Sequence, residues 1–229
     1  KAERATLRAE KLAAAGRLVR TLAHEVRNPI NNINLASEHL RSSNLPDDTG
    51  LYLDIIHRNS ERINELIKEL LNSSRPSEMQ LKESTLQSLI DDIVNASRDR
   101  INLKNIGLQV DYPRDLIIIQ CDYEKMVIAL LNILINAVEA IEHNNGRISI
   151  NARKEKELCM IEISDNGTGI SEEKLPRLFE PYYTSKRNGI GLGLAATLNI
   201  IQAHNGVIEV NSEVNKQTVF TITLPLKPQ

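Results

Sequence analysis

One histidine of this chain has neighbours that suit it to nucleophilic chemistry. His24 is followed at once by Glu25, with Asn28 and Pro29 about one helical turn further on. A neutral imidazole can attack an electrophile, and an ordinary histidine, with a pKa of about 6.5, is mostly neutral at pH 7. A carboxylate beside it can accept the Nδ1 proton, which leaves Nε2 as the attacking nitrogen. We therefore take His24 as a candidate nucleophile and Glu25 as its acid–base partner.

Pro29 predicts a bend in the helix near His24, and the remaining histidines have no comparable neighbours. Because proline has no N–H, the helix loses its bond to the carbonyl one turn earlier, and we expect a bend that presents His24. The other four histidines lack such neighbours, and we expect them to be ordinary surface residues: His39, His57, His143 and His204.

Two asparagines lie in an otherwise apolar stretch. Asn132 and Asn136 are four residues apart among Ile, Leu, Val and Ala, so they share one face of a buried helix. A buried amide without partners costs about 1 to 3 kcal/mol, so something polar must meet them. One alternative is that they bond only to backbone groups across a sheet. The other is that Asn136 binds Mg²⁺ through its side-chain oxygen, because Mg²⁺ takes few protein oxygens beside nucleotide phosphates.

A glycine-containing run follows a predicted strand. It reads Asp165-Asn-Gly167-Thr-Gly169, a composition that is also common in purely structural turns. In the functional alternative, the Asp165 carboxylate accepts an N–H of the exocyclic amino group of adenine. Gly167 and Gly169 would then let the backbone come close to the base. Guanine carries an acceptor at that ring position, so this arrangement favours ATP over GTP.

Three further glycines precede a predicted helix. Gly189, Gly191 and Gly193 lie before and at its start, where unpaired N–H groups and the helix dipole favour a phosphate. Lys186 can add a positive charge. The run is not a dinucleotide fingerprint, because Leu194 stands where the third glycine would be, and the sequence contains no P-loop motif.

The composition argues against several classes of protein. The 229 residues carry a net charge of −2, and no basic run with interleaved aromatics points to nucleic acid. Cys121 and Cys159 lie far apart without a CxxC pair, which predicts reduced thiols and no zinc site. The densest apolar stretch, 126–141, is too short and too polar to span a membrane. We expect a cytoplasmic location without direct membrane contact. A chain that begins within a helical pattern also fits the cytoplasmic part of a membrane-bound sensor.

Residues 1–76 predict a long helical hairpin. Apolar residues recur every three or four positions from Leu18 to Ile33, and a turn follows at 44–48. A second apolar stripe comprises Ile56, Ile63, Ile67 and Leu70. So thin a hairpin cannot bury both its faces alone, and we expect two copies to pair as a dimeric four-helix bundle. The alternative is a lone coiled-coil spacer.

Residues 77–229 predict an α+β sandwich, in which a mixed sheet has helices on one face. Thr85 and Asp122 are candidate helix caps. We expect helices over 85–99, 122–142 and 191–204, and strands at 108–111, 116–120, 147–152, 158–164, 207–210 and 218–224.

Taken in order, five short runs resemble the sensor histidine kinases of two-component systems. Each run is unremarkable alone, but all five with these spacings are specific. The resemblance extends from about Gly16 to Pro225, and implies a HisKA-type dimerisation and phosphotransfer hairpin followed by an ATP-binding domain of the GHKL, or Bergerat, type. The runs are His24-Glu-x-x-Asn-Pro, Asn132-xxx-Asn136-Ala, Asp165-x-Gly-x-Gly, Phe179-Glu-Pro and Gly189-x-Gly-x-Gly.

The resemblance implies roles for individual residues. His24 resembles the phosphoacceptor and Glu25 its acid–base partner. Asn28 resembles the residue that positions water for dephosphorylating the partner regulator. Asn132 and Asn136 resemble the metal and phosphate pair.

Three residues further along also match the family. Asp165 resembles the adenine reader, Phe179 the anchor of the lid, and Thr218 the threonine that supports the adenine aspartate. This sequence departs from the family in three places. Tyrosines follow Phe179-Glu-Pro where phenylalanines are common, the lid at 182–188 is short, and Gln217 replaces the glycine usual before Thr218.

The function that the resemblance implies is ATP-dependent, with Mg²⁺ as the metal. His24 would be autophosphorylated and would pass the phosphoryl group to an aspartate of a response-regulator receiver domain, with phosphatase activity toward that regulator. We expect the receiver to dock near Ile30, Asn34 and Leu35, and the upstream sensor domain to lie outside this chain. The alternatives are an ATPase of the same fold and a catalytically silent dimeric scaffold. Asn132 argues against the ATPase, because hydrolytic relatives often carry glutamate there.

Overall fold

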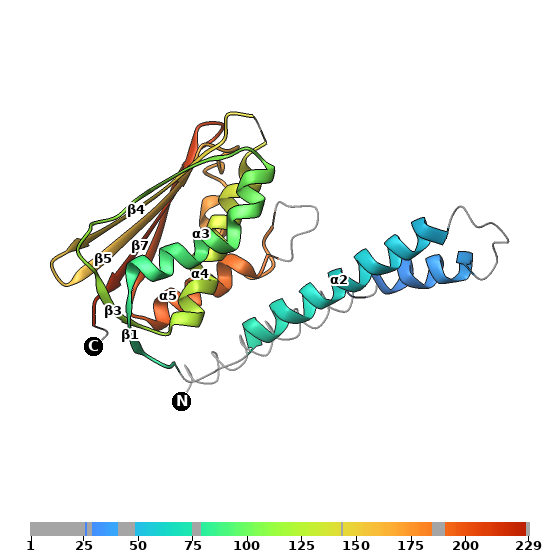
Figure 1. Cartoon of the computed structure of the whole chain (residues 1–229), viewed down its shortest axis with the longest axis horizontal. Coiled ribbons are helices and arrows are strands. Elements are labelled where there is room, and N and C mark those ends of the chain that lie inside the picture. The colour runs from blue at the N-terminus through green and yellow to red at the C-terminus, as the bar shows by residue number, and fades with distance from the viewer. Residues whose placement is uncertain are drawn as a thin grey trace. The chain divides into compact units, whose positions relative to one another are not determined.

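The computed structural model describes residues 26, 29–40, 49–74, 79–142, 144–184 and 191–227. The chain forms two compact units, Lys1–Arg75 and Pro76–Gln229 (Figure 1). Several functional candidates lie outside the described part, and so does His143, which the sequence predicts to be a surface residue. The candidates are His24, Glu25, Asn28, Lys186 and Gly189.

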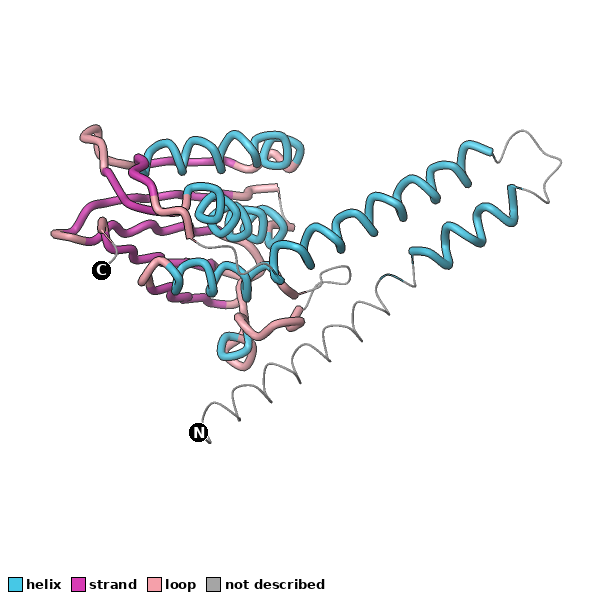
Figure 2. Tube along the Cα trace, turned by 90° about the horizontal axis from the view of Figure 1, so that it is seen from below, coloured by secondary structure: helices cyan, strands magenta, loops and turns pink. Residues whose placement is uncertain are grey.

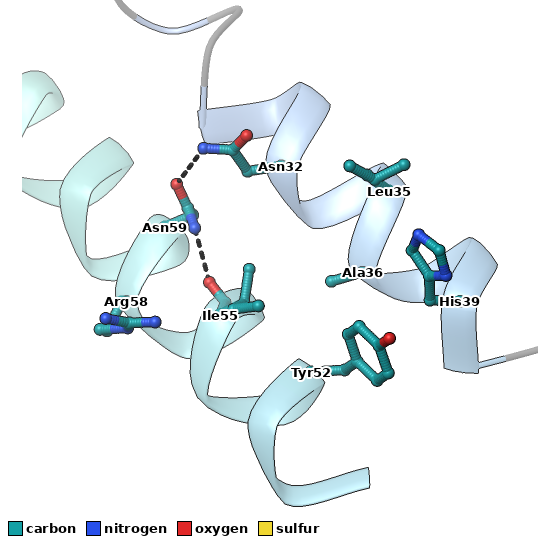
Figure 3. A pocket seen from close by; sticks show the side chains of 8 residues that line it. All are labelled: Asn32, Leu35, Ala36, His39, Tyr52, Ile55, Arg58 and Asn59. Carbon is teal, nitrogen blue, oxygen red and sulfur yellow. Dashed lines mark hydrogen bonds between the residues drawn. The ribbon is translucent and has the colours of Figure 1, made fainter. Parts of the chain in front are cut away.

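The first unit is a helical hairpin. Residues 29–40 are helical and pack against α2 (Thr49–Ser74). The amide of Asn32 donates through Nδ2 to Oδ1 of Asn59, at 3.1 Å, and Asn59 in turn donates to the Ile55 carbonyl, at 2.7 Å (Figure 3). The rings of His39 and Tyr52 stack with their centroids 5.3 Å apart. Polar and aromatic contacts thus join the two helices.

The second unit is built on a five-stranded mixed sheet, in the order β2-β4-β5-β7-β6. β2 is parallel to β4, and the other neighbours are antiparallel. Helices α3, α4 and α5 cover one face of the sheet in both views (Figures 1 and 2). The strands are β2 (Gly107–Asp111), β4 (Arg147–Glu155), β5 (Leu158–Asp165), β6 (Val207–Glu213) and β7 (Gln217–Pro225); the helices are α3 (Leu86–Leu103), α4 (Tyr123–Ala140) and α5 (Gly193–Ala203).

Alternation along the strands creates the core of this unit. In β5 the side chains of Cys159, Ile161 and Ile163 are buried, and those between them are half-buried. Side chains of one strand point alternately to opposite faces of a sheet, so one face carries apolar groups toward the helices and the other remains polar. Cys121 and Cys159 are both buried and free, and burial raises the pKa of Cys159 to about 12.

Two helices begin at the predicted caps. Thr85 accepts from the Ser88 N–H at 3.2 Å, and Asp122 accepts from the Lys125 N–H at 3.3 Å. Burial acts to raise the pKa of Asp122, but the Gln80 and Lys125 N–H groups and the Lys125 ammonium outweigh it, so this pKa is lowered. Each cap satisfies an N–H group that the helix itself cannot use.

The predicted fold class is confirmed, with differences of detail. The predicted helices and strands form, with ends shifted by a few residues. Two elements were not predicted: β1 (Lys82–Thr85), which pairs with β3 (Ile118–Cys121), and the short 3₁₀ helix η2 (Leu175–Arg177). β1 was missed because its sequence, KEST, lacks the apolar alternation that reveals a strand. Among the helices that the structure describes, none is long and apolar enough to cross a membrane.

Candidate functional site

The two asparagines of α4 lie beside the beginning of α5. Asn132 donates through Nδ2 to the Gly193 carbonyl at 3.3 Å. A Cβ added at Gly193 would lie 3.7 Å from the Asn132 amide. Asn136 lies one turn further along α4 and is half-buried, as Asn132 is. The structure thus brings together two predicted runs that are separated by more than fifty residues.

The start of α5 has no side-chain cap. Leu192 stands at the cap position, and no side-chain hydrogen bond is made there. Gly191 precedes it with φ of +73°, and its carbonyl accepts from the Tyr182 N–H at 2.9 Å. A Cβ at Gly191 would lie 2.6 Å from the Tyr182 carbonyl carbon, so the close approach requires glycine. Among the residues that the structure describes, no side chain caps the start of α5, which is what an anion site requires.

Asp165 ends β5 with a buried carboxylate. Its side chain is 4% exposed, and its Oδ1 accepts from the Gly167 N–H at 2.9 Å. Burial disfavours the charged form and raises the pKa of Asp165 to about 6, although the Gly167 N–H acts in the opposite direction. A buried carboxylate with so little compensation is energetically costly, and it suits a ligand that brings N–H donors.

The loop after Asp165 is held between two other elements. The Thr168 N–H donates to the Ala140 carbonyl at the end of α4, at 2.9 Å, and the Asn215 N–H donates to the Thr168 carbonyl, also at 2.9 Å. A Cβ at Gly167 would lie 2.5 Å from the Ala140 oxygen, and one at Gly169 would lie 2.3 Å from the Glu213 oxygen. Both glycines are therefore required by close backbone contacts.

Thr218 lies next to Asp165 across the sheet. The two residues are register partners of β5 and β7, and Thr218 is also the partner of Ser212 on β6. Its hydroxyl is 2.9 Å from the Ser212 hydroxyl, which in turn accepts from the Ile170 N–H at 2.8 Å. Thr218 therefore contributes to one hydrogen-bonded group at the end of the sheet.

Phe179, another residue that the sequence singles out, lies between the loop after Asp165 and α5. Phe179 is half-buried and packs against the core of the second unit. Nearby, the Arg177 guanidinium lies 4.4 Å from the ring centre of Tyr183 and forms an ion pair with Glu180 at 3.1 Å. These contacts lie within residues 177–183, before the part of the chain that the structure leaves undescribed.

Several residues that shape the site were not found from the sequence. Thr197 is fully buried and donates to the Gly193 carbonyl at 3.0 Å. Ser212 carried no motif, although its place on the inward side of β6 was a usable signal. The expectation that His204 lies on the surface is wrong. It is 2% exposed, because its Nε2 accepts from the Asp122 N–H at 2.9 Å and its Nδ1 donates to the Ile200 carbonyl at 2.7 Å.

The hairpin unit carries a separate groove. It has a volume of about 580 Å³ and lies between the helical residues 29–40 and α2 (Figure 3). Ile30, Leu35, Leu51 and Leu53 are more than 40% exposed on this unit. A single hairpin thus leaves apolar surface uncovered. The groove is lined by Asn32, Leu35, Ala36, His39, Tyr52, Ile55, Arg58 and Asn59.

The chain matches two protein families. Residues 121–228 match "Histidine kinase-, DNA gyrase B-, and HSP90-like ATPase", and residues 14–79 match the "His Kinase A (phospho-acceptor) domain". Sporulation kinase E of Bacillus subtilis is 34% identical over 96% of this chain, and sensor histidine kinase ZraS of Escherichia coli is 33% identical over 96%. This chain belongs to the sensor histidine kinases. The resemblance inferred from the five runs is confirmed.

Solved histidine kinases share the architecture. Histidine kinase ThkA, in its complex with response regulator protein TrrA, superposes with a TM-score of 0.79 at 26% identity, over 96% of this chain and 64% of that one. The Acinetobacter baumannii histidine kinase AdeS gives a TM-score of 0.72 at 21% identity, over 89% of this chain and 98% of that one, and supports the fold alone. The chain spans 30% of sporulation kinase E and 47% of ZraS, so it corresponds to less than half of these relatives.

Proposed function

We propose that this histidine kinase binds ATP in its second unit, phosphorylates His24 and passes the phosphoryl group to an aspartate of a response-regulator receiver domain. The observation that carries the proposal is the convergence of three features: the buried Asp165 carboxylate, the uncapped start of α5 and the asparagine face of α4. A carboxylate acceptor suits the adenine amino group, and free N–H groups at a helix start suit phosphate. Asn132, which bonds to the Gly193 carbonyl, would contact both phosphate and metal.

The residues of the site divide into groups by what they would contact. Asp165 would accept from adenine, and Gly167, Gly169 and Thr218 would support that contact. Gly191 and Gly193, with Gly189 and Lys186 outside the described residues, would face the phosphates. Asn136 would hold Mg²⁺, and Asn132 would assist. The half-buried amides of α4 fit a hard cation that takes oxygen ligands. Bound Mg²⁺ would neutralise charge on the phosphates.

The transfer uses one nucleophile and one proton acceptor. Nε2 of His24 attacks the γ-phosphorus of ATP while the bond to the β,γ-bridging oxygen breaks, and ADP leaves. The Nδ1 proton passes to Glu25, which stabilises the imidazolium as it develops. A receiver aspartate then attacks the phosphorus, the N–P bond breaks, and Glu25 returns the proton. Phosphoryl transfer depends mainly on positioning, so the site needs few reactive groups.

The partners follow from the hairpin. We propose that residues 1–76 form the dimerisation and phosphotransfer domain, with two copies pairing as a four-helix bundle, and that residues 77–229 form the ATP-binding domain. Leu51, an apolar residue of α2 that is 56% exposed on the single hairpin, supports such pairing. ThkA was solved with a response regulator, which supports a receiver as the second partner. We further propose a cytoplasmic location and an Asn28-dependent phosphatase activity toward the regulator.

The receiver is expected to dock beside the groove of the hairpin. Ile30 is 42% exposed, Leu35 is 54% exposed, and Asn34 is exposed as well. Leu35→Ala should slow transfer to the receiver several-fold, while autophosphorylation keeps its rate. Leu53→Ala, an equally exposed change on α2 away from the groove lining, is the control. Equal transfer rates for both variants would refute this docking surface.

The proposal is tested with γ-labelled ATP and Mg²⁺. Wild-type protein should acquire an acid-labile, alkali-stable label, and His24→Gln should acquire none while still binding ATP. His39→Gln is the matched control, since His39 lies in the same hairpin and should keep the label. Label that persists in His24→Gln would contradict the assignment. Steady ATP turnover without any phosphoprotein would instead identify an ATPase of the same fold.

A further inference from the structure

A single row of polar side chains ends the apolar face of the sheet. Asp165 on β5, Thr218 on β7 and Ser212 on β6 are successive register partners. The preceding rows on the same face are apolar: Ile163 with Phe220 and Val210, then Ile161 with Ile222 and Ile208. The polar row thus forms the last rung before the loop that Asp165 begins.

The hydroxyl of Ser212 has three neighbours, and their chemistry fixes its role. The Ile170 N–H, at 2.8 Å, can only donate, and the Gln217 carbonyl, at 3.0 Å, can only accept. The third neighbour, the Thr218 hydroxyl at 2.9 Å, can do either. A serine hydroxyl has one proton and two lone pairs. With one lone pair used by Ile170 and the proton given to Gln217, the remaining lone pair accepts the proton of Thr218.

This assignment determines what Thr218 offers to a ligand. Its only proton is committed to Ser212, so its oxygen presents lone pairs and no donor. Beside it, the Asp165 carboxylate is also an acceptor. The end of the row therefore presents hydrogen-bond acceptors to a ligand. A purine with an exocyclic amino group can donate to them, and a purine without one cannot.

We propose that Ser212 is a positioning residue that sets the nucleotide specificity of this kinase by fixing the proton direction of Thr218. The inference rests on the proposed ATP site. Ser212 does not itself contact the base in this account. Ser212 also accepts from the Ile170 N–H at the end of the loop that follows Asp165, and the two roles are separable by experiment.

The experiment compares ATP with purine riboside triphosphate, which lacks only the amino group. The ratio of their dissociation constants measures the preference for that group. In Ser212→Ala the Thr218 proton is released and can point toward the ligand, so the preference should fall about five- to tenfold, as for one impaired hydrogen bond. Ser212→Thr retains a hydroxyl and should restore the preference. Ser149→Ala, the same change on β4 of the same sheet, should leave it unchanged.

A purely structural role for Ser212 gives a different pattern. Hydrogen exchange at the Ile170 amide should speed up in Ser212→Ala in either case, because its acceptor is lost. If both nucleotides weaken equally in that variant, the specificity role is overturned. Ser212→Cys, with a weaker hydrogen-bonding group of similar shape, makes the same test if the alanine variant does not fold. Failure of the wild type to bind ATP would overturn the proposed function itself, a result distinct from an unchanged preference.

Discussion

The two ends of the α4–α5 helix pair differ in how far their polar groups are hydrogen-bonded within the chain. At one end, which we call the closed end, the Asp122 backbone N–H donates to Nε2 of His204, and Nδ1 of His204 donates to the Ile200 carbonyl. The Asp122 carboxylate there accepts from the Lys125 N–H. At the other, the open end, the carboxylate of Asp165 is buried with one N–H donor, and α5 starts without a side-chain cap. The two helices run antiparallel, so both ends belong to one packed pair.

We infer from this difference that the closed end stabilises the fold and that the open end binds a ligand. At the closed end the N–H groups of Gln80, Asp122 and Lys125 have acceptors within the chain, and this arrangement stabilises the fold. At the open end, burial raises the pKa of Asp165 to about 6, which shows that the folded chain disfavours the charge there. Such a cost is retained where a ligand compensates for it. Changes at the closed end should therefore reduce stability, and changes at the open end should reduce affinity.

The largest expected effect on stability comes from His204 at the closed end. His204→Ala removes a buried ring and leaves the Asp122 N–H without its acceptor, so unfolding should become easier by about 2 to 4 kcal/mol. ATP affinity of the folded protein should change little. Gln202→Ala, an exposed change in the same last turn of α5, is the control for denaturant unfolding. A His204→Ala protein as stable as this control would contradict the stabilising role of the closed end.

Two glycines of the open end should differ in their tolerance of a methyl group. Gly167→Ala places a Cβ 2.5 Å from the Ala140 oxygen and should cost about 2 kcal/mol or more, because backbone must move. Gly193→Ala meets only the Asn132 amide at 3.7 Å and should change stability by less than about 1 kcal/mol. Thermal unfolding of the pair gives the result. Equal losses would show that the loop after Asp165 is not held against α4.

The pH dependence of binding should report on Asp165. Its raised pKa of about 6 means that the carboxylate acceptor is present at pH 8 and lost as the pH falls through 6. At pH 5, one unit below, the preference for ATP over purine riboside triphosphate should be about tenfold smaller than at pH 8. The two nucleotides carry the same phosphates, so their ratio removes phosphate titration. A constant ratio across this range would show that Asp165 does not read the amino group.

The smallest effect is expected at the end of α4 near the site. Lys104 donates through Nζ to the carbonyls of Val138 and Ile141, each at 2.9 Å, and so satisfies the last turn of α4. Lys104→Met should reduce stability by about 1 kcal/mol. Arg98→Met, at another exposed cation of α3, serves as the control. If both variants unfold alike, Lys104 does not cap α4.

Local signals explain most of what the sequence predicted. Thr85 and Asp122 cap helices as expected, because capping depends on residues three positions apart. Strand alternation predicted the buried face of β5 for the same reason. The parallel pairing of β2 with β4 was not visible, because it depends on how α4 crosses between them rather than on either strand alone.

The candidate site was predictable only where short motifs marked it. Asp165 and Gly193 belong to recognisable runs, but the proximity of Asn132 to Gly193 needed the packing of α4 on α5. Ser212 and Thr197 stand in no motif, and their partners lie on other elements. His204 was misjudged because its partner, Asp122, lies 82 residues away in the sequence.

The most direct test of this comparison is the thermal stability of wild type and Asp165→Asn at pH 7.5, without and with Mg²⁺ and ATP. A raised pKa in the folded state favours stability below the unfolded value near 4, and this contribution is lost as the pH rises through about 6. The uncharged variant avoids that loss, so without nucleotide it should be more stable than wild type by about 1 to 3 kcal/mol. With ATP the wild type should gain stability and the variant should not. A variant less stable than wild type without nucleotide, or equal stabilisation of both by ATP, would contradict the account.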